Sequence, residues 1–325
     1  MMHAESEEIV REFFDRRRIQ LKEVKLKIAI VMLFCIIGIN TAWAENDKKI
    51  QQQTDLLLVA STAREMQFGF EKRIIFPFLQ GTSALTSGNN ITLKFGAELT
   101  PVSINILADT IWTPIAFLSF SLGSQIGSGW NYDMFGTRMN GMGLYRHAAQ
   151  GDPEEFADGS GLDGAVWDVH LGAALQFDLA AIFPGDWNHV VMKFENIVNY
   201  QNYTKARGTE QWYFKADDGI NQNTFGYYFS GFLGYQMPLF LDMVGFQFES
   251  SLPFYNPQSG QSLTNRKPEM FWSLLAEFTI GKSFNIITIA QLSNRLIHPV
   301  TANYDRQWKF YRVIVIGIWR LEGRH

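Results

Sequence analysis

The stretch Trp167–Leu179, WDVHLGAALQFDL, alternates large apolar side chains with polar or small ones over its whole length. Its odd-numbered residues are all apolar, whereas Asp168, His170 and Asp178 are among the even-numbered ones. Successive side chains of a β-strand point to opposite faces, so the alternation predicts a strand with one apolar and one polar face. Strands of soluble sheets are most often about 5–6 residues long, whereas about 9–11 tilted residues cross a membrane. The length of the stretch and the charges on its polar face therefore favour a strand that spans a membrane.

The same alternation recurs along most of the chain. It is clearest in residues 91–99, 102–109, 118–125, 225–236, 244–249 and 272–279. Amphipathic segments of about ten residues separated by turn residues are typical of a transmembrane β-barrel. We therefore expect an all-β fold, an antiparallel barrel over residues 65–325 with 10–12 strands. Twelve is preferred because bacterial single-chain barrels have an even number of strands. A soluble β-sandwich or lipocalin-like binder is the alternative, since alternation alone does not say which face is inside.

The connections between these segments fall into short turns and longer polar loops. Short turns are predicted at Thr100-Pro101, Thr113-Pro114, 183–186, Met237-Pro238 and 281–283, and longer loops at 134–163, 201–210 and 255–268. Outer-membrane barrels have short turns at one rim and long loops at the other. If both Thr-Pro pairs are turns, the 134–163 loop shares a rim with short turns, and the pattern alone leaves this open.

The N-terminal region predicts export. Lys22, Lys25 and Lys27 precede the apolar run 28–39, and an Ala-Trp-Ala triplet ends at Ala44. A basic region, a short apolar region and an A-x-A site are typical of a signal peptide, with cleavage after Ala44. The apolar run is too short for a transmembrane helix.

The domain organisation follows from that cleavage site. The charged residues 1–23 extend the basic region of the signal peptide. One hypothesis is that this part is untranslated and synthesis starts near Val24 at a non-ATG codon; a genuinely long basic region is the alternative. Residues 45–64, polar and of possible helical pattern, are expected to form a short periplasmic segment before the barrel.

Charge and cysteine content exclude some functions. Residues 1–44 hold 7 of the 28 Lys and Arg and 6 of the 32 Asp and Glu, which leaves 21 basic against 26 acidic residues. Nucleic-acid binders need a basic face, so we expect no nucleic-acid partner. The single cysteine, Cys35, lies in the predicted signal peptide, which excludes a disulfide framework or a cysteine metal site in the exported chain. No cofactor and no metal ion are expected.

The signal peptide, the alternating strands and the final segment Arg312–Leu321 (RVIVIGIWRL) together resemble Gram-negative outer-membrane β-barrel proteins. The Thr-Pro turns resemble spirochaete examples of that class. The resemblance implies location in the outer membrane, with membrane lipid and the barrel-insertion machinery as partners. Such barrels usually end on an aromatic residue that the machinery reads, whereas this chain continues to His325. Trp319 or Leu321 is then the expected anchor.

The polar faces of the predicted strands carry both signs of charge. The candidate lumen-lining residues are Lys94, Glu98, Asp109, Asp168, His170, Gln176, Asp178, Lys193, Glu195, Glu249 and Glu277, with Lys215, Asp217 and Arg312 as further inward charges. Charged walls around water select permeating ions, which favours a pore or transporter for small hydrophilic or amphiphilic solutes. The same residues can instead fill a narrow lumen. The alternative is therefore a structural or surface-interaction barrel that presents the 134–163 loop.

An enzymatic barrel is the third hypothesis. Outer-membrane lipid hydrolases carry a His two residues before a Ser-Asn pair, and the segment Gln291–Asn294 (QLSN) resembles that motif. Here Gln291 stands in the position of the His, and an amide cannot take the proton of Ser293. We therefore expect no catalysis. Asp168 and His170 share one strand face, which predicts a hydrogen bond in the lumen in preference to a metal or pH-sensing site.

Overall fold

The structure is a computed structural model that describes residues 50–134, 137–139, 141–146, 155–156, 162, 164–208, 210, 212–215, 221–254, 268–294 and 307–321. The predicted signal peptide with its cleavage site at Ala44, and most of the 134–163 and 255–268 loops, lie outside this part.

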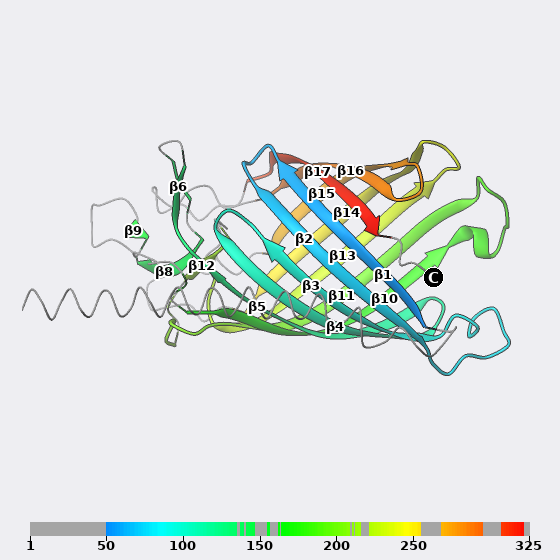
Figure 1. Ribbon diagram of the computed structural model, residues 1–325, viewed down its shortest axis with the longest axis horizontal. Helices are drawn as coiled ribbons and strands as arrows, with labels where there is room; N and C mark the ends of the chain where they lie inside the picture. The colour runs from blue at the N-terminus through cyan, green and yellow to red at the C-terminus, as the bar shows by residue number, and fades with distance from the viewer. Residues whose placement is uncertain are drawn as a thin grey trace, which may run out of the picture. The chain divides into compact units, whose positions relative to one another are not determined.

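Twelve long strands make up most of the described chain. They are β1 (Gln51–Ser61), β2 (Met66–Pro77), β3 (Asn90–Leu99), β4 (Ser103–Ile115), β5 (Leu118–Gly129), β10 (Val166–Asp178), β11 (His189–Tyr203), β13 (Thr224–Gln236), β14 (Leu241–Pro253), β15 (Glu269–Ile280), β16 (Phe284–Ser293) and β17 (Lys309–Leu321). Each pairs antiparallel with its neighbours, and β1 pairs with β17, so that the sheet closes on itself in the order β1-β17-β16-β15-β14-β13-β11-β10-β5-β4-β3-β2. Figure 1 shows these strands running obliquely around the barrel. The prediction of an antiparallel barrel with twelve strands is confirmed.

Shorter elements lie in the connections. They are β6 (Tyr132–Met134), β7 (Thr137–Met139), β8 (Met142–Arg146), β9 (Glu155–Phe156), β12 (Trp212–Phe214) and the 3₁₀-helix η1 (Leu179–Ala181). β8 pairs with β12 and with β9, and β6 pairs with β7. Within the described residues, no helix is both long and apolar enough to cross a bilayer.

The barrel carries its apolar face outside. Leu171 of β10 lies opposite Leu122 of β5 and Val198 of β11, and the three side chains are 63%, 57% and 47% exposed. Residues directly opposite in an antiparallel pair share a face, so the odd-numbered residues of β10 and their partners form one outer surface. A soluble sandwich would instead bury such residues, since water around apolar surface is unfavourable. Exposed apolar side chains around a closed sheet are what a membrane barrel presents to lipid.

The strand predicted over 167–179 ends one residue early. β10 ends at Asp178, whose carboxylate accepts a hydrogen bond from the backbone N–H of Ala180 at 3.0 Å. This cap begins the 3₁₀ turn of η1, so Leu179 leaves the sheet.

The prediction that residues 45–64 form a periplasmic segment before the barrel is corrected by the structure. Gln51–Ser61 of this segment form barrel strand β1. The residues QQQT at 51–54 and the run LLLV at 56–59 contain no alternation, which concealed the strand. In the structure Leu58 faces outward, 48% exposed, while Leu57 and Val59 take the inner face. β2 and β16 were also not predicted as separate strands.

The two Thr-Pro pairs differ in role. Thr100-Pro101 forms the turn between β3 and β4, where the Thr100 N–H donates to the carbonyl of Ser103 at 2.9 Å. Thr113-Pro114 lies inside the end of β4, where the register with β5 shifts between Trp112 and Ile115. A proline cannot donate to the sheet and is tolerated at such an irregularity. The β3–β4 turn therefore shares a rim with the 134–163 loop.

The polarity of the outer face yields a prediction for stability. Leu171 lies near the middle of β10, so Leu171→Arg places a charge at the level of the lipid core. We expect a loss of about 2–4 kcal/mol in the free energy of unfolding, against a small change for Leu171→Val. Denaturant unfolding in phosphatidylcholine liposomes, followed by tryptophan fluorescence, measures both. Equal stabilities for the Arg and Val variants would contradict the outward assignment.

Candidate functional site

The inner face of the barrel holds the polar residues that alternate with the exposed apolar ones. The pairing registers place there Lys94 and Glu98 (β3), Asp109 (β4), Asp168, His170, Gln176 and Asp178 (β10), Lys193 and Glu195 (β11), Glu249 (β14) and Glu277 (β15). Arg312 of β17 shares this face. The eleven candidate residues thus come from six different strands of one continuous wall.

One sector of the wall carries a row of linked charges. The Lys94 ammonium lies 3.1 Å from Glu71 and 3.9 Å from Asp109, and so bridges β2 and β4. Asp109 lies 2.9 Å from Nε2 of His170, whose Nδ1 lies 3.0 Å from Asp168. These charges are largely removed from water, and each acid has a basic or hydrogen-bonding partner, as buried charges require. The predicted Asp168–His170 hydrogen bond is present, with Asp109 as a second partner.

Gly123 makes the link between Asp109 and His170 possible. It lies on β5, between β4 and β10, directly opposite both residues. A Cβ built at Gly123 would lie 1.9 Å from Oδ1 of Asp109 and 2.5 Å from Nε2 of His170. Only a residue without a side chain lets the two groups meet across the intervening strand.

The remaining candidates of the barrel interior form local pairs. Lys193 lies 3.4 Å from Glu195 on the same face of β11. The Tyr228 hydroxyl donates to Glu249 at 2.6 Å, between β13 and β14. These contacts distribute acidic and basic groups around the lumen, and the balance of signs defines no ion preference.

Three candidates, Gln176, Asp178 and Glu277, lie toward the rim opposite the 134–163 loop. Asn285 donates to the Glu277 carboxylate at 2.6 Å. Asp178 lies 2.7 Å from Nδ1 of His189, and this pair spans the connection between β10 and β11. The Gln176 amide donates to a backbone carbonyl of the β4–β5 turn at 3.2 Å.

Glu98 pairs with a residue that does not belong to a barrel strand. Its carboxylate lies 2.7 Å from the Lys215 ammonium, directly after β12. Lys215 was expected on a strand facing inward; instead it lies in the long connection between β11 and β13, and Asp217 lies outside the described residues. The N–H of Lys215 also donates to the carbonyl of Gly141 at 2.7 Å, beside β8.

The paired strands β8 and β12, with Lys215 directly after β12, form what we call the mouth insert. Trp212 and Tyr213 are the most buried apolar residues of the described chain, at 1% exposed, and Met142 and Phe214 of the insert are also buried, at 2% and 8%. They pack with Val166 and Tyr203 at the ends of β10 and β11. The insert therefore has a core of its own, and it is packed against the barrel wall.

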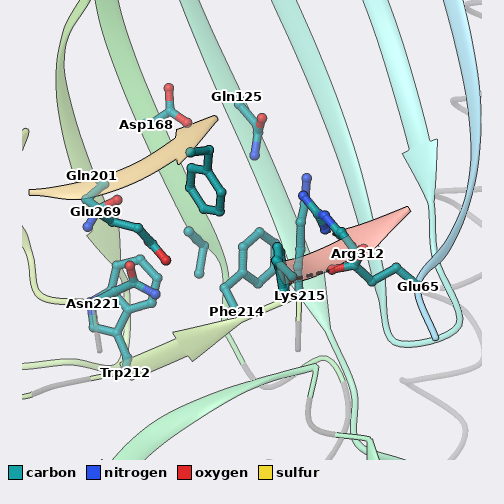
Figure 2. A pocket seen from close by; sticks show the side chains of 13 residues that line it. Glu65, Gln125, Asp168, Gln201, Trp212, Phe214, Lys215, Asn221, Glu269 and Arg312 are labelled. Atoms are coloured by element: carbon teal, nitrogen blue, oxygen red, sulfur yellow. Dashed lines mark hydrogen bonds and ion pairs between the residues drawn. The ribbon is translucent and has the colours of Figure 1, made fainter. Parts of the chain in front are cut away.

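A cavity of about 390 Å³ lies between the mouth insert and the wall. Figure 2 shows it from close by, with Trp212, Phe214 and Lys215 coming from the insert and Gln125, Asp168 and Arg312 from the wall. Its lining is completed by Glu65, Val166, Gln201, Asn221, Glu269, Phe271 and Tyr311. Arg312 is ion-paired with Glu65 and lies over the Tyr311 ring at 4.5 Å. The cavity thus combines both signs of charge with aromatic surface.

Sequence reasoning missed the charges on β1 and β2. Glu71 is ion-paired with Arg73, and Asp55 lies 3.6 Å from Nε of Arg320. The signal was present in β2, where Gln67, Gly69, Glu71 and Arg73 alternate with apolar residues, but Lys72 interrupts the apolar face. β1 has no such alternation.

The QLSN segment serves the structure of the strand end. The Gln291 side chain donates to Ser273 at 3.2 Å and accepts from Arg312 at 2.9 Å. Asn294 accepts from the Met270 N–H at 2.6 Å. Ser293 is 1% exposed, and in the described residues no base contacts it. His298 lies outside the described part of the chain. Among the described residues, no group of three or more potential metal ligands is close enough to hold a metal ion.

Comparisons with known proteins add little to this description. No protein-family model matches the sequence, and no curated protein has significant similarity to it. Among solved structures, the NanC porin aligns over 83% of this chain and 100% of its own, at 6% identity and a TM-score of 0.41. The KdgM porin aligns over 84% and 99%, at 8% identity and a TM-score of 0.35. The β domain of the Bordetella autotransporter BrkA aligns over 85% and 100%, at 9% identity and 0.39. Such values carry no information about solute or partner.

The close approach at Gly123 yields a second prediction. Gly123→Ala forces Asp109 and His170 apart, and we expect the free energy of unfolding to fall by about 1–3 kcal/mol. Gly231→Ala is the matched control on β13, because its nearest neighbour would be 3.5 Å away, an ordinary contact. That variant should stay within about 0.5 kcal/mol of the parent. The same unfolding measurement in liposomes compares the two, and equal effects would show that the link across β5 has no energetic weight.

Proposed function

We propose that this chain is an outer-membrane β-barrel that acts as a pore or transporter for small solutes. The observation that carries the proposal is the reversed polarity of the closed sheet, with exposed apolar residues outside and linked charges inside. Two inward residues of β5 support an open path, because Ser119 and Ser121 have small side chains and leave space beside the charged row.

The chain topology suggests an orientation. The 130–165, 204–223, 254–268 and 294–308 connections lie at one rim, and in outer-membrane barrels the longer loops are extracellular. The mouth insert would then face the outside of the cell. Export by a signal peptide cleaved at Ala44, assembly by the barrel-insertion machinery and a spirochaete-like origin stay predictions.

The mouth insert would act as the constriction of this pore. It is joined to the far side of the mouth by the Lys215–Glu98 ion pair. It is also joined to the end of β11 through Asn223, which accepts from Trp212 Nε1–H at 3.0 Å and donates to the carbonyl of Tyr203 at 3.2 Å. Solutes would pass beside the insert through the cavity, whose balanced charges suit neutral or amphiphilic molecules.

A second candidate function follows from the same insert. Its buried core, with Trp212 and Tyr213 1% exposed, favours a lumen that is filled at one end. In that case the barrel would be a structural or surface-interaction protein, and the long loops would carry its function. Conductance distinguishes the two candidates.

The pore proposal predicts discrete conductance. Full-length chain refolded in detergent and added to a planar phosphatidylcholine bilayer should give stepwise current increases. Heat-modifiable migration on a gel confirms that the same preparation is folded. A folded preparation that inserts but gives no steps would contradict the pore and favour the filled barrel.

The ion pair at the mouth predicts an effect on that conductance. Glu98→Gln and Lys215→Met each remove one partner, and a partly exposed pair is worth about 0.5–1 kcal/mol. If the insert narrows the pore while it is attached, a single channel alternates between a fully conducting state and a narrowed one. We therefore expect the ratio of fully conducting to narrowed states to rise about two- to fivefold. The double exchange Glu98→Lys with Lys215→Glu should restore the parental ratio.

Single-channel recording measures this ratio. Lys193→Met is the matched control, because its pair with Glu195 lies on β11 away from the insert. An equal rise in the control variant would show that lumen charge, and not the attachment of the insert, controls the current.

A further inference from the structure

The inner face of the barrel is not polar all the way round. Eight aliphatic side chains point inward from four adjacent strands, and we call this surface the aliphatic wall. It consists of Leu57 and Val59 (β1), Ile314, Ile316 and Ile318 (β17), Ile287 and Ile289 (β16) and Leu275 (β15). Sequence reasoning assigned apolar residues to the outer face and did not predict it.

The wall is continuous from strand to strand. Ile316 lies opposite Val59 on one side and Ile287 on the other. Ile314 lies opposite Ile289, which in turn lies opposite Leu275. Because directly opposed residues have their Cβ atoms about 4.5–5.5 Å apart, these side chains form one apolar surface.

Polar groups mark both ends of the wall. Arg312, with its partner Gln291, precedes Ile314 at the mouth, and Arg320, beside Asp55, follows Ile318 at the other rim. The two arginines are eight positions apart in the sequence, which corresponds to about 26 Å along a strand. The wall is thus a long apolar strip with a charged group at each end.

The wall faces open space. Ile314 is 9% exposed and the other seven side chains are half-buried, although the barrel is closed around them. In the strand order, β10 lies six places from β17 and β5 six places from β16, so these strands face one another across the lumen. Their inward residues include Ser119, Ser121, Gly172 and Ala174, which are too small to reach across.

A purely hydrophilic solute gains nothing from such a strip, since apolar surface in a watery lumen is unfavourable until an apolar group covers it. A protein segment cannot enter from the side, because the twelve strands are hydrogen-bonded all round. The occupant must therefore be thin, apolar along its length and polar at an end. The cavity beside Arg312 continues the wall at the mouth and offers both signs of charge to a polar head.

We propose that the lumen takes up single-chain amphiphiles, with the alkyl chain along the aliphatic wall and the polar head in the cavity beside the mouth insert. This proposal names the substrate class of the proposed pore or transporter. Transport of an amphiphile through the barrel rests on that proposed function. Binding itself needs only the wall and the cavity.

Photo-crosslinking tests the binding site directly. The full-length chain, refolded in phosphatidylcholine liposomes, is irradiated with dodecanoic acid that carries a diazirine at its terminal carbon, and the adducts are located by mass spectrometry. We expect adducts at the inward residues Ile287, Ile289, Ile314 and Ile316. Lipid-dissolved probe also labels outward residues such as Thr288 and Val315. Adducts confined to outward residues would overturn the proposal.

Variants of the wall provide the matched comparison. The triple variant Ile289→Thr, Ile314→Thr and Ile316→Thr keeps branched side chains suited to strands but adds hydroxyls. Inward labelling should fall about tenfold, while the control Ile111→Thr with Ile197→Thr, on inward positions of β4 and β11, leaves it unchanged. Equal labelling in both variants would overturn the proposal. If the triple variant lacks heat-modifiable migration, Ile316→Thr alone replaces it, with inward labelling expected to fall.

Conductance, recorded in parallel, separates this proposal from the pore. Inward labelling without current steps supports the amphiphile site and contradicts the pore. Current steps without inward labelling support the pore and overturn the amphiphile site. With both present, dodecanoate should reduce the current of the parent more than that of the wall variant, and an equal reduction would overturn the role of the wall in transport.

Discussion

The pairing of β1 with β17 is the constraint on which the rest of the structure depends. An open sheet would leave backbone N–H and C=O groups unpaired at two edges, and each such group costs several kcal/mol in lipid. Closure pairs Thr54–Ser61 of β1 with Ile314–Leu321 of β17 and removes both edges. It also creates two surfaces with opposite demands, because the outside meets lipid while the inside must accommodate most of the polar side chains of the strands.

The inner surface meets this demand in two ways. On β2–β5 and β10, charges are linked from Glu71 to Asp168, and Gly123 provides the gap through which Asp109 and His170 meet. Around the middle of β1, β16 and β17, and at Leu275 of β15, the inner face is aliphatic instead. The lumen is therefore itself amphipathic, and its two walls face each other across the narrow interior. This division, more than the number of charges, limits which solutes can lie inside.

The mouth insert adds a second kind of packing. Most large apolar residues of the barrel strands are exposed or only partly buried, whereas β8 and β12 bring Trp212, Tyr213 and Phe214 into a core like that of a soluble domain. The insert comes from two connections, its paired residues lie 68–72 positions apart in sequence, and its strands are short. Pattern analysis of the sequence does not recognise β8 or β12. β12, for example, spans three residues, which are too few to show a period of two.

The sequence by itself determined the fold class, an expected number of 10–12 strands, and the division of strands such as β10 into a polar and an apolar face, because strict alternation leaves only one way to divide the residues of a strand between two faces. Closure of the sheet with its apolar residues exposed then decided that the polar face is the inner one. The sequence did not reveal β1, where the run LLLV at 56–59 places Leu57 and Val59 inside. Only the tertiary structure decided which inward residues meet. Lys215 reaches Glu98 over 117 residues, and the aliphatic wall joins Val59 to Ile316, because closure brings the two ends of the barrel sequence side by side. Periodicity reports the environment of a single strand, whereas the chemistry of the lumen depends on the register between strands.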